Sequence, residues 1–299
     1  AVSTGPNWAY LRIAEGCDNR CAYCVIPSLR GKFRSRTKES ILEEARLLAA
    51  SGVKELIIVA QDITRYGIDL YGKVCLTELL KELCKLDFRW VRLHYLYPEL
   101  IDDELIDEIA SEDKIVKYLD IPIQHINDTI LRRMNRRGTG EEIRALFKKL
   151  RERIPGLVLR TSLITGLPGE GEAEFEELCD FLREAKIERA GVFPYSPEEG
   201  TPAALMPDRC STEEAQRRAE LCMEIQAEIM DGFAETFIGR ELDVLVMGRE
   251  PDGTPWGRSE YDSPDIDSRV IFSGDAAPGD MVRVRIDSVD DGELIGEQI

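Results

Sequence analysis

The sequence predicts an α/β protein, in which a partial TIM-like barrel of six β/α units is followed by a small all-β barrel resembling an OB fold. Short β-branched runs alternate with amphipathic helical stretches over the first three quarters of the chain, which indicates βαβ units and a parallel sheet. There are six such units rather than eight, so we expect an open barrel. After Gly239 the pattern changes to apolar–polar alternation between Gly, Pro and Asp turns, which is typical of a small β-barrel.

Six segments of the first part are expected to be strands: Tyr10–Ala14, Glu55–Ala60, Trp90–Tyr95, Val116–Ile121, Leu157–Ile164 and Arg189–Phe193. Helical patterns lie between them, such as SILEEARLLAASG, in which Ile41, Ala45 and Leu48 share one face and Gly52 follows the last turn. TELLKELCKL and EAEFEELCDFLREA are two more. Ligands of such barrels bind at the C-terminal ends of the strands.

A long helix is predicted from Thr212 to about Phe237, with Ala219, Met223 and Met230 on an apolar face that Gln226 interrupts. Five alternating segments follow and predict a five-stranded barrel of about 60 residues. These segments are ELDVLVMG, GTPWGRSEY, SRVIFSG, MVRVRIDSV and ELIGEQI. We therefore predict two domains, residues 1–237 and residues 238–299.

Composition and charge limit the classes of partner. The chain of 299 residues is 43% hydrophobic and 32% charged, and no apolar run approaches the roughly 20 residues of a membrane span. The first residues, AVSTGPNWAYLRI, lack the basic start and apolar core of an export signal, so we expect a cytoplasmic protein without membrane contact. The net charge of −18 argues against tight nucleic-acid binding and favours a basic partner.

Eight cysteines in such a chain do not suggest a disulfide framework. Five occur singly in helix-like segments and are expected to be small buried apolar residues: Cys75, Cys84, Cys179, Cys210 and Cys222. The other three, Cys17, Cys21 and Cys24, share one loop, GCDNRCAYCVIP. Three thiolates can ligate three irons of a [4Fe–4S] cubane and leave the fourth iron open. The alternative, a structural zinc site, normally needs four protein ligands, and no fourth Cys or His lies nearby.

The CxxxCxxC spacing, with the aromatic Tyr23 before its third cysteine, resembles the signature of the radical S-adenosylmethionine (SAM) superfamily. The resemblance implies that SAM chelates the open iron. It also implies that an electron passed through the cluster cleaves SAM to methionine and a 5′-deoxyadenosyl radical. Tyr23 would lie near the adenine; ordinary loop packing is its alternative role. Beyond the cluster ligands we assign no catalytic residue.

Further segments resemble the methylthiotransferase family of this superfamily, namely RGKFRSR, VAQDITRYG, DIPIQHINDTILRRMNRRG and RTSLITGLPGE, and the ending resembles that family's TRAM domain. Gln61, Asp62 and Gln124 fall at the C-terminal ends of predicted strands, where cofactor contacts belong in this architecture, so we expect SAM or substrate contacts for them, and also for Ser162. Capping or loop hydrogen bonding remains the alternative for Gln61, its neighbour Asp62 and Gln124. Two histidines also follow strands, His94 and His125, and we assign neither a role. The basic run RGKFRSRTK either attracts a carboxylate or is a solvated helix start.

The last domain indicates the substrate class. From Gly239 to Ile299 there are six Arg, no Lys and fifteen Asp or Glu, a net charge of −9. Such a surface repels RNA phosphates and attracts a cationic protein loop. GRSEYDSPDIDSRVIF and LHYLYPE resemble the RimO type of the family. That resemblance implies methylthiolation of an aspartate β-carbon in the small-subunit ribosomal protein S-twelve, with a reducing electron donor.

Two other functions remain open at this point, a methylthiotransferase acting on transfer RNA and a non-enzymatic metal-binding ribosome adaptor. The family also has an N-terminal domain that holds a second [4Fe–4S] cluster on three more cysteines. This chain starts almost at the first barrel strand, and its five other cysteines lack ligand-like spacing. We therefore expect a form without that domain, which binds one cluster and cleaves SAM slowly but does not methylthiolate.

Overall fold

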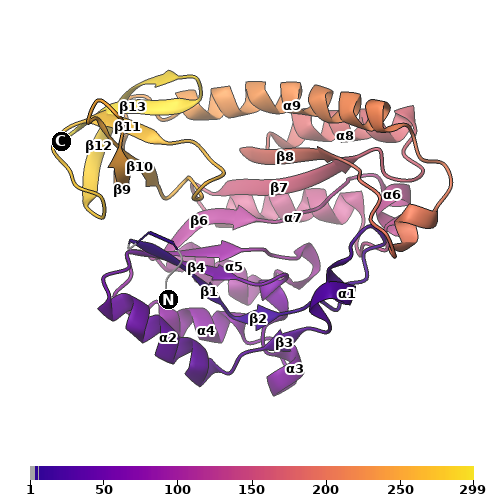
Figure 1. The fold of residues 1–299 in the computed structure, drawn as a ribbon, viewed down its shortest axis with the longest axis horizontal. Helices are drawn as coiled ribbons and strands as arrows, with labels where there is room; N and C mark the ends of the chain where they lie inside the picture. The colour runs from indigo at the N-terminus through magenta and orange to yellow at the C-terminus, as the bar shows by residue number, and fades with distance from the viewer. Residues whose placement is uncertain (1–3, 6) are drawn as a thin grey trace.

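Six parallel strands form a curved sheet in the computed structural model of the chain, which describes residues 4–5 and 7–299 (Figure 1). The strand order is β1-β4-β5-β6-β7-β8. Among the described residues the edge strands β1 and β8 do not pair with each other, so the barrel is open on one side, as predicted. The strands are β1 (Trp8–Arg12), β4 (Glu55–Val59), β5 (Trp90–His94), β6 (Ile115–Asp120), β7 (Val158–Thr165) and β8 (Arg189–Pro194).

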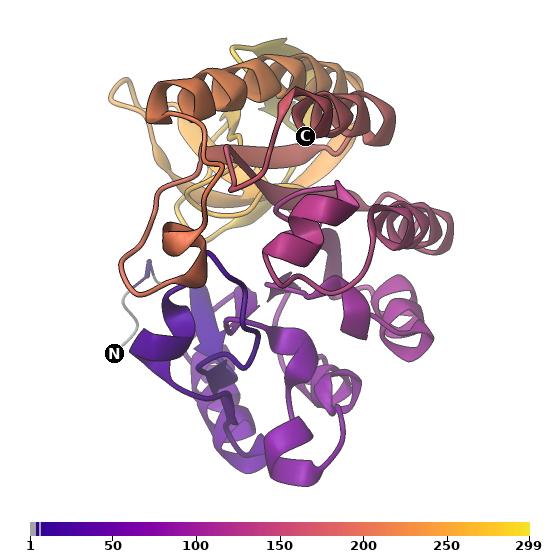
Figure 2. The same cartoon turned by 90° about the vertical axis from the view of Figure 1, so that its right-hand side faces the viewer.

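Helices cover the outer side of this sheet (Figure 2). Their starts follow local capping chemistry: Thr139 and Glu142 form a capping box at α7, and Asp102 accepts a hydrogen bond from the Leu105 N–H at the start of α5. The α-helices are α1 (Ile26–Arg30), α2 (Lys38–Ala50), α3 (Ile68–Tyr71), α4 (Leu76–Leu83), α5 (Asp103–Ser111), α6 (Asp128–Arg133), α7 (Gly140–Arg153), α8 (Glu172–Ala185) and α9 (Thr212–Glu235). Three short 3₁₀ helices are η1 (Ile63–Arg65), η2 (Pro98–Leu100) and η3 (Pro202–Leu205).

The two faces of the parallel sheet differ in chemistry. Residues such as Leu11, Ile58 and Leu93 are fully buried in the main hydrophobic cluster, which they share with the helices. The alternate residues point to the inside of the barrel, because successive side chains of a strand lie on opposite faces. This inner face is polar in its middle, where Arg92 and Arg160 lie.

The C-terminal part forms a closed five-stranded barrel in the order β10-β11-β13-β12-β9, as the alternating pattern predicts. Its strands are β9 (Glu241–Arg249), β10 (Pro255–Ser259), β11 (Val270–Ser273), β12 (Met281–Asp290) and β13 (Glu293–Gln298). Its own hydrophobic cluster includes Val244, Phe272 and Ile286. Of the helices that the structure describes, none has both the length and the apolar composition that crossing a membrane requires.

The small barrel packs against the N-terminal ends of the parallel strands. Leu245 of β9 lies in one cluster with Trp90, Tyr118 and Val158 of the large barrel. Helix α9 runs along the side of the molecule to connect the two parts, while α1 and its neighbouring loops lie at the opposite end (Figure 1). The second domain therefore closes one end of the large barrel, and the loops that follow the strands occupy the other.

Several elements differ from those that the sequence predicts. Strand β1 begins and ends two residues earlier than expected, and a two-residue hairpin of β2 (Ala14–Glu15) and β3 (Arg34–Ser35) follows it. On α9, Met223 is exposed, whereas Gln226 is fully buried because its Nε2 donates to the Ile187 carbonyl at 2.9 Å. Four of the five single cysteines are buried, as predicted, and Cys210 is half-buried.

Candidate metal centre and cofactor site

The three clustered cysteines lie on the loop between β2 and α1, at the C-terminal end of the barrel strands. Gly16 opens this loop with a φ of +82°, and a Cβ there would approach the Lys32 carbonyl oxygen to 2.2 Å, so only glycine fits. The Cys17 N–H donates to the Gly31 carbonyl at 3.1 Å, and the Ala22 N–H donates to the Met134 carbonyl at 2.8 Å. Backbone hydrogen bonds and the requirement for glycine at position 16 therefore hold the loop in place.

Cys17, Cys21 and Cys24 line one hollow of about 590 Å³, together with residues such as Lys32 and Pro202. Cys21 is buried, and the other two thiols are half-buried. Burial raises the pKa of Cys17 and of Cys24. A bound metal would offset this effect, because coordinated thiols are deprotonated.

The donors are suited to a polynuclear cluster, because three thiols of one loop line one hollow. In a cubane each iron takes a separate thiolate, so three thiols around one hollow provide three ligands without converging. The donor set therefore suits a [4Fe–4S] cluster.

Two residues from distant segments surround Cys21. The Tyr97 hydroxyl lies 2.9 Å from Cys21 Sγ, and Arg136 Nη1 lies 3.8 Å from the same sulfur. Arg136 also stacks over the Tyr97 ring at 4.3 Å and donates to the Pro122 carbonyl at 2.6 Å. Sequence reasoning gave neither residue a role, although both lie in quoted motifs, LHYLYPE and RRMNRRG. The motifs do not reveal which tyrosine or arginine turns inward.

The four residues predicted to contact SAM are Tyr23, Gln61, Gln124 and Ser162. They lie at the same end of the large barrel as the cysteine loop or on the inner face of its sheet. Tyr23 packs beside a small cluster that includes Ala22, Leu167 and Tyr195. Gln124 is paired with β7, because its N–H donates to the Ser162 carbonyl at 2.9 Å. These assignments stay predictions.

Gln61 follows β4, and its Oε1 is buried without a hydrogen-bond partner among the described residues. Such an orphaned acceptor is costly, and a ligand donor would satisfy it. This observation supports a bound group that donates a hydrogen bond at Gln61.

The Asp62 carboxylate is used in hydrogen bonds within the chain. Its carboxylate accepts hydrogen bonds from the Thr64 N–H and from Asn19 Nδ2, both at 3.1 Å. It thereby caps η1 and holds the cysteine loop against β4. Burial raises the pKa of Asp62, and these hydrogen bonds oppose that effect.

Both histidines and Glu170 are buried. His125 Nε2 lies 3.2 Å from Glu170 Oε2, and Glu170 also accepts hydrogen bonds from the Gly166 N–H and from Arg218 of α9. The LPGE segment therefore links β7 to α9 through Glu170. His94 lies 3.4 Å from the hydroxyl of Ser263 in the second domain.

Most of the basic run after the cysteines is used in local pairs. Arg36 pairs with Glu44 at 2.6 Å, Lys38 pairs with Glu78, and Arg30 lies 3.4 Å from Glu15. Lys32 lines the cysteine hollow. The sequence left two roles open for this run, attraction of a carboxylate and a solvated helix start. Local ion pairs account for most of the basic residues, and Lys32 is the one placed to meet a ligand.

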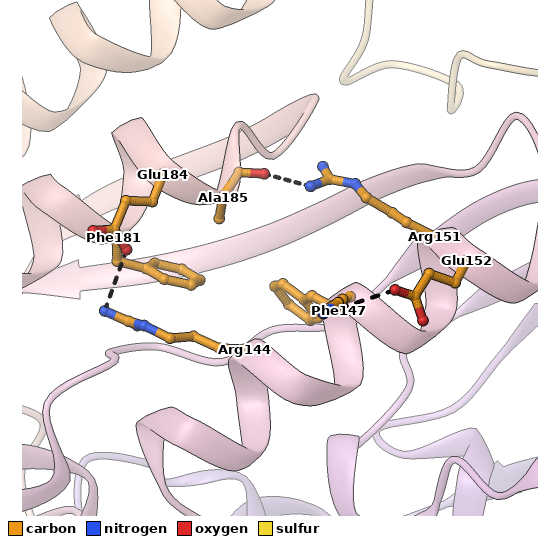
Figure 3. Close-up of a pocket in the computed structure, with 8 residues that line it drawn as sticks. Arg144, Phe147, Arg151, Glu152, Phe181, Glu184 and Ala185 are labelled. Atoms are coloured by element: carbon orange, nitrogen blue, oxygen red, sulfur yellow. Dashed lines mark hydrogen bonds and ion pairs between the residues drawn. The ribbon is translucent and has the colours of Figure 1, made fainter.

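A second hollow, of about 450 Å³, lies between α7 and α8 on the outer side of the barrel (Figure 3). The Phe147 and Phe181 rings line it, and Arg144 stacks on Phe181 at 5.0 Å and lies 3.9 Å from Glu184. Its described lining residues include none of the predicted site residues. This hollow is therefore separate from the candidate metal centre.

Comparisons with known proteins agree with this geometry. Residues 11–182 match the model of the radical SAM superfamily, and residues 238–299 match that of the TRAM domain. The chain is 49% identical over 299 residues to the ribosomal protein uS12 methylthiotransferase RimO of Caldanaerobacter subterraneus subsp. tengcongensis. It is 52% identical over 303 residues to the protein of that name from Pelotomaculum thermopropionicum. The alignments cover 99% and 100% of this chain and 68% of each relative.

Solved structures share the fold. Coproporphyrinogen III oxidase (HemN) from Escherichia coli, a radical SAM enzyme, superposes with a TM-score of 0.57 at 20% identity, over 76% of this chain and 54% of that one. The radical SAM methyltransferase TsrM from Kitasatospora setae gives a TM-score of 0.54 at 21% identity, over 66% and 38%. At such identities the likeness extends to the fold alone.

Proposed function

The chain belongs to the radical SAM superfamily and, within it, to the methylthiotransferases of the RimO type, and from this premise we propose that it methylthiolates an aspartate β-carbon of ribosomal protein uS12 (S-twelve). It is a SAM-dependent methylthiotransferase. One observation carries the proposal: identity near 50% to uS12 methylthiotransferases extends along the chain, including the loop whose three thiols line one hollow. A ribosomal substrate also places its action in the cytoplasm.

Cys17, Cys21 and Cys24 would hold a [4Fe–4S] cluster, with one thiolate on each of three irons. When bound, the cluster and SAM together supply a carbon-centred radical that removes hydrogen from an unactivated C–H bond. No general base in a protein ionises such a bond, which is the chemical reason for the cofactor. Reduction requires an electron donor from outside the chain.

Four side chains are proposed to bind SAM: Tyr23, Gln61, Gln124 and Ser162. Gln61 is the best supported, because its buried Oε1 needs a donor. Ser162 lies on the inner face of β7, beside the backbone of Gln124. Tyr23 offers a ring next to the third cysteine for stacking on a base.

The rest of the chain keeps water from the site. The apolar cluster of Ala22, Ile130, Met134, Leu167, Tyr195 and Ala203 packs against the cysteine loop. At the other end, Asp267 of the second domain accepts a hydrogen bond from the Tyr118 hydroxyl at 2.6 Å and helps to close the barrel. Exclusion of water protects a reactive radical from side reactions.

The charge of the second domain favours a protein substrate. Asp262 and Asp267 share one ion-pair partner within the molecule, Arg189, at 2.8 Å and 3.7 Å. Other acids, such as Asp290 and Asp291, are exposed. With a net charge of −9 over Gly239–Ile299, this domain attracts a cationic ribosomal protein and repels RNA phosphates.

The test is a comparison of two substrates under anaerobic conditions. The protein, at its full natural length, is reconstituted with iron and sulfide and given SAM and a chemical reductant. It is then incubated with either uS12 or transfer RNA. We expect the mass of uS12 to rise by one methylthio group and the RNA to remain unmodified.

The control is a variant in which all three cysteines are replaced by alanine, which should modify neither substrate. Methylthiolation of transfer RNA with unmodified uS12 would overturn the proposed substrate. Zinc in place of iron, without SAM cleavage, would favour the non-enzymatic adaptor.

A further inference from the structure

Among the described residues, four arginines of the parallel strands lie at inner-face positions, and they differ in how exposed they are. Arg92 and Arg189 are buried and paired with Glu55 and Asp262, although Arg92 Nη1 and Nη2 and Arg189 Nε have no hydrogen-bond partner among the described residues. Arg12 lies exposed on the edge strand β1 and pairs with the nearby Glu15. The fourth, Arg160, lies near the start of β7, the strand beside the edge strand β8.

Arg160 is held on one side only. Its Nη1 donates to Asp120 Oδ2 at 2.7 Å, and among the described residues this is the single hydrogen bond of the guanidinium. Its side chain is 15% exposed, whereas Asp120 is fully buried. The Nε and Nη2 donors of Arg160 therefore remain free for a ligand that reaches the inner face.

The position along the strand also suits a substrate. Arg160 and Ser162 are on the same face of β7, and a strand rises about 3.3 Å per residue, so the two are about 7 Å apart along the strand. Ser162 lies nearer the cysteine loop, and Arg160 lies nearer the second domain. A group anchored at Arg160 therefore lies about two residues along β7 from Ser162, which is proposed to bind SAM.

The surroundings fit an organic ligand with one charged end. One large aromatic side chain near Arg160 is exposed: Tyr95, which follows β5 and lies within electrostatic reach of Arg160. The other titratable groups near Arg160 are Asp267 of the second domain, His94 and Tyr118. An exposed aromatic ring beside a free guanidinium edge is typical of a site that recognises a carboxylate on an apolar stem.

We propose that Arg160, oriented by Asp120, binds the side-chain carboxylate of the target aspartate. This inference rests on the proposed function and adds a specificity residue to it. A guanidinium matches the two oxygens of a carboxylate in a fork that neither lysine nor a neutral side chain reproduces. Aspartate is thereby distinguished from asparagine, and its β-carbon is held in a fixed direction.

The test measures binding rather than turnover. Two fluorescent peptides of the uS12 target loop carry either aspartate or asparagine at the modified position, and their Kd values are measured by anisotropy. We expect the wild-type protein to bind the aspartate peptide about tenfold or more tightly, which is the size of a charge-assisted hydrogen bond. In the double variant Asp120→Asn/Arg160→Gln, the ratio of the Kd for the asparagine peptide to the Kd for the aspartate peptide should be about one.

The double variant is used because Arg160→Gln alone leaves a buried carboxylate unpaired and can unfold the protein. Asp120→Asn alone removes the competing carboxylate and keeps the guanidinium, so it should keep or increase the preference for aspartate. Arg144→Gln removes one charge from the outer hollow between α7 and α8 and should leave the ratio unchanged. Thermal unfolding of each variant verifies that it is folded.

Persistence of the wild-type ratio in a folded double variant would overturn the role of Arg160, and so would a wild-type protein that binds both peptides equally. These outcomes are separate from failure of the proposed function. A protein that methylthiolates uS12 but shows no effect of Arg160 refutes this inference alone, whereas one that never modifies uS12 refutes the function itself.

Discussion

Glu55 of β4 and Arg258 of β10 form a buried ion pair that joins the two domains. Glu55 is fully buried at the N-terminal end of its strand, and it also accepts a hydrogen bond from Arg92 Nε at 2.7 Å. Burial alone would raise the pKa of Glu55, but Arg258 and Arg92 together lower it to about 2. The carboxylate is therefore charged in the folded protein and depends on a partner 203 residues away.

Replacing Arg258 by glutamine should destabilise the protein by about 3–5 kcal/mol, because it leaves a buried charge with one partner fewer. The double variant Glu55→Gln/Arg258→Gln should lose less than the sum of the two single changes, since the Arg258 charge is also gone and only Arg92 is left without its carboxylate partner. Urea unfolding provides the measurement. The control is Arg285→Gln, which breaks the exposed pairs with Asp287 and Glu297 in the same small barrel and should cost less than about 1 kcal/mol. An Arg258 variant as stable as this control would contradict the prediction.

Stability should fall as the pH drops through the range in which His94 would titrate in the unfolded chain. Burial, together with Arg92 and Arg160, lowers the pKa of His94 from 6.5 to about 3, although Glu55 acts in the opposite direction. Between these values the unfolded chain binds a proton that the folded protein excludes, so the stabilising effect is complete above pH 6.5 and lost toward pH 3. From this residue alone, the loss between about pH 7.5 and about pH 5 is about 2 kcal/mol.

The measurement is the free energy of unfolding at both pH values, for wild type and for His94→Gln. Glutamine is neutral and can still form a hydrogen bond with Ser263, so the variant should lose less stability over this pH range. Equal pH dependence of the two proteins would show that another group causes the acid sensitivity.

Much of the fold could be predicted because its signals are local. The five strands of the small barrel follow strict alternation with turn residues between them, and the strands of the large barrel are short apolar runs between helical patterns. The start of β1 was wrong by two residues, because the run WAYLRIA is apolar at both ends and contains no turn signal. The β2–β3 hairpin has two residues per strand, which is too short to produce a periodic pattern.

The candidate site could be predicted only in its local part. Three cysteines within eight residues identify the metal centre from spacing alone. Tyr97 and Arg136 meet Cys21 from 76 and 115 residues away, and no sequence pattern specifies that contact. The proposed role of Arg160 could not be predicted from sequence either, since the structure is needed to show that Asp120 is its single hydrogen-bond partner among the described residues.

Loss of any one clustered cysteine should abolish stable iron binding. After anaerobic reconstitution we expect about four irons per 299-residue chain, and fewer than about one for Cys17→Ala, Cys21→Ala or Cys24→Ala, because two thiolates do not retain a cubane. Iron analysis and the visible absorbance near 400 nm measure this outcome. Cys210→Ala, a change at a half-buried single cysteine, should keep the full iron content. Iron retained in all three cluster variants would refute the assignment of these ligands.

The hydroxyl of Tyr97 should raise the reduction potential of a cluster bound at Cys21. It lies 2.9 Å from Cys21 Sγ, and a donor to a ligating sulfur stabilises the more negative, reduced form. Tyr97→Phe removes this hydrogen bond and keeps the ring on which Arg136 stacks. The potential should therefore fall by an amount on the order of tens of millivolts, which corresponds to one hydrogen bond for a one-electron couple. A redox titration followed by electron paramagnetic resonance measures the shift at unchanged iron content. The matched control is Tyr195→Phe, which should leave the potential unchanged. The hydroxyl of Tyr195 is buried and has no hydrogen-bond partner among the described residues. A Tyr97 variant with the wild-type potential would mean that the hydroxyl does not donate to the ligating sulfur.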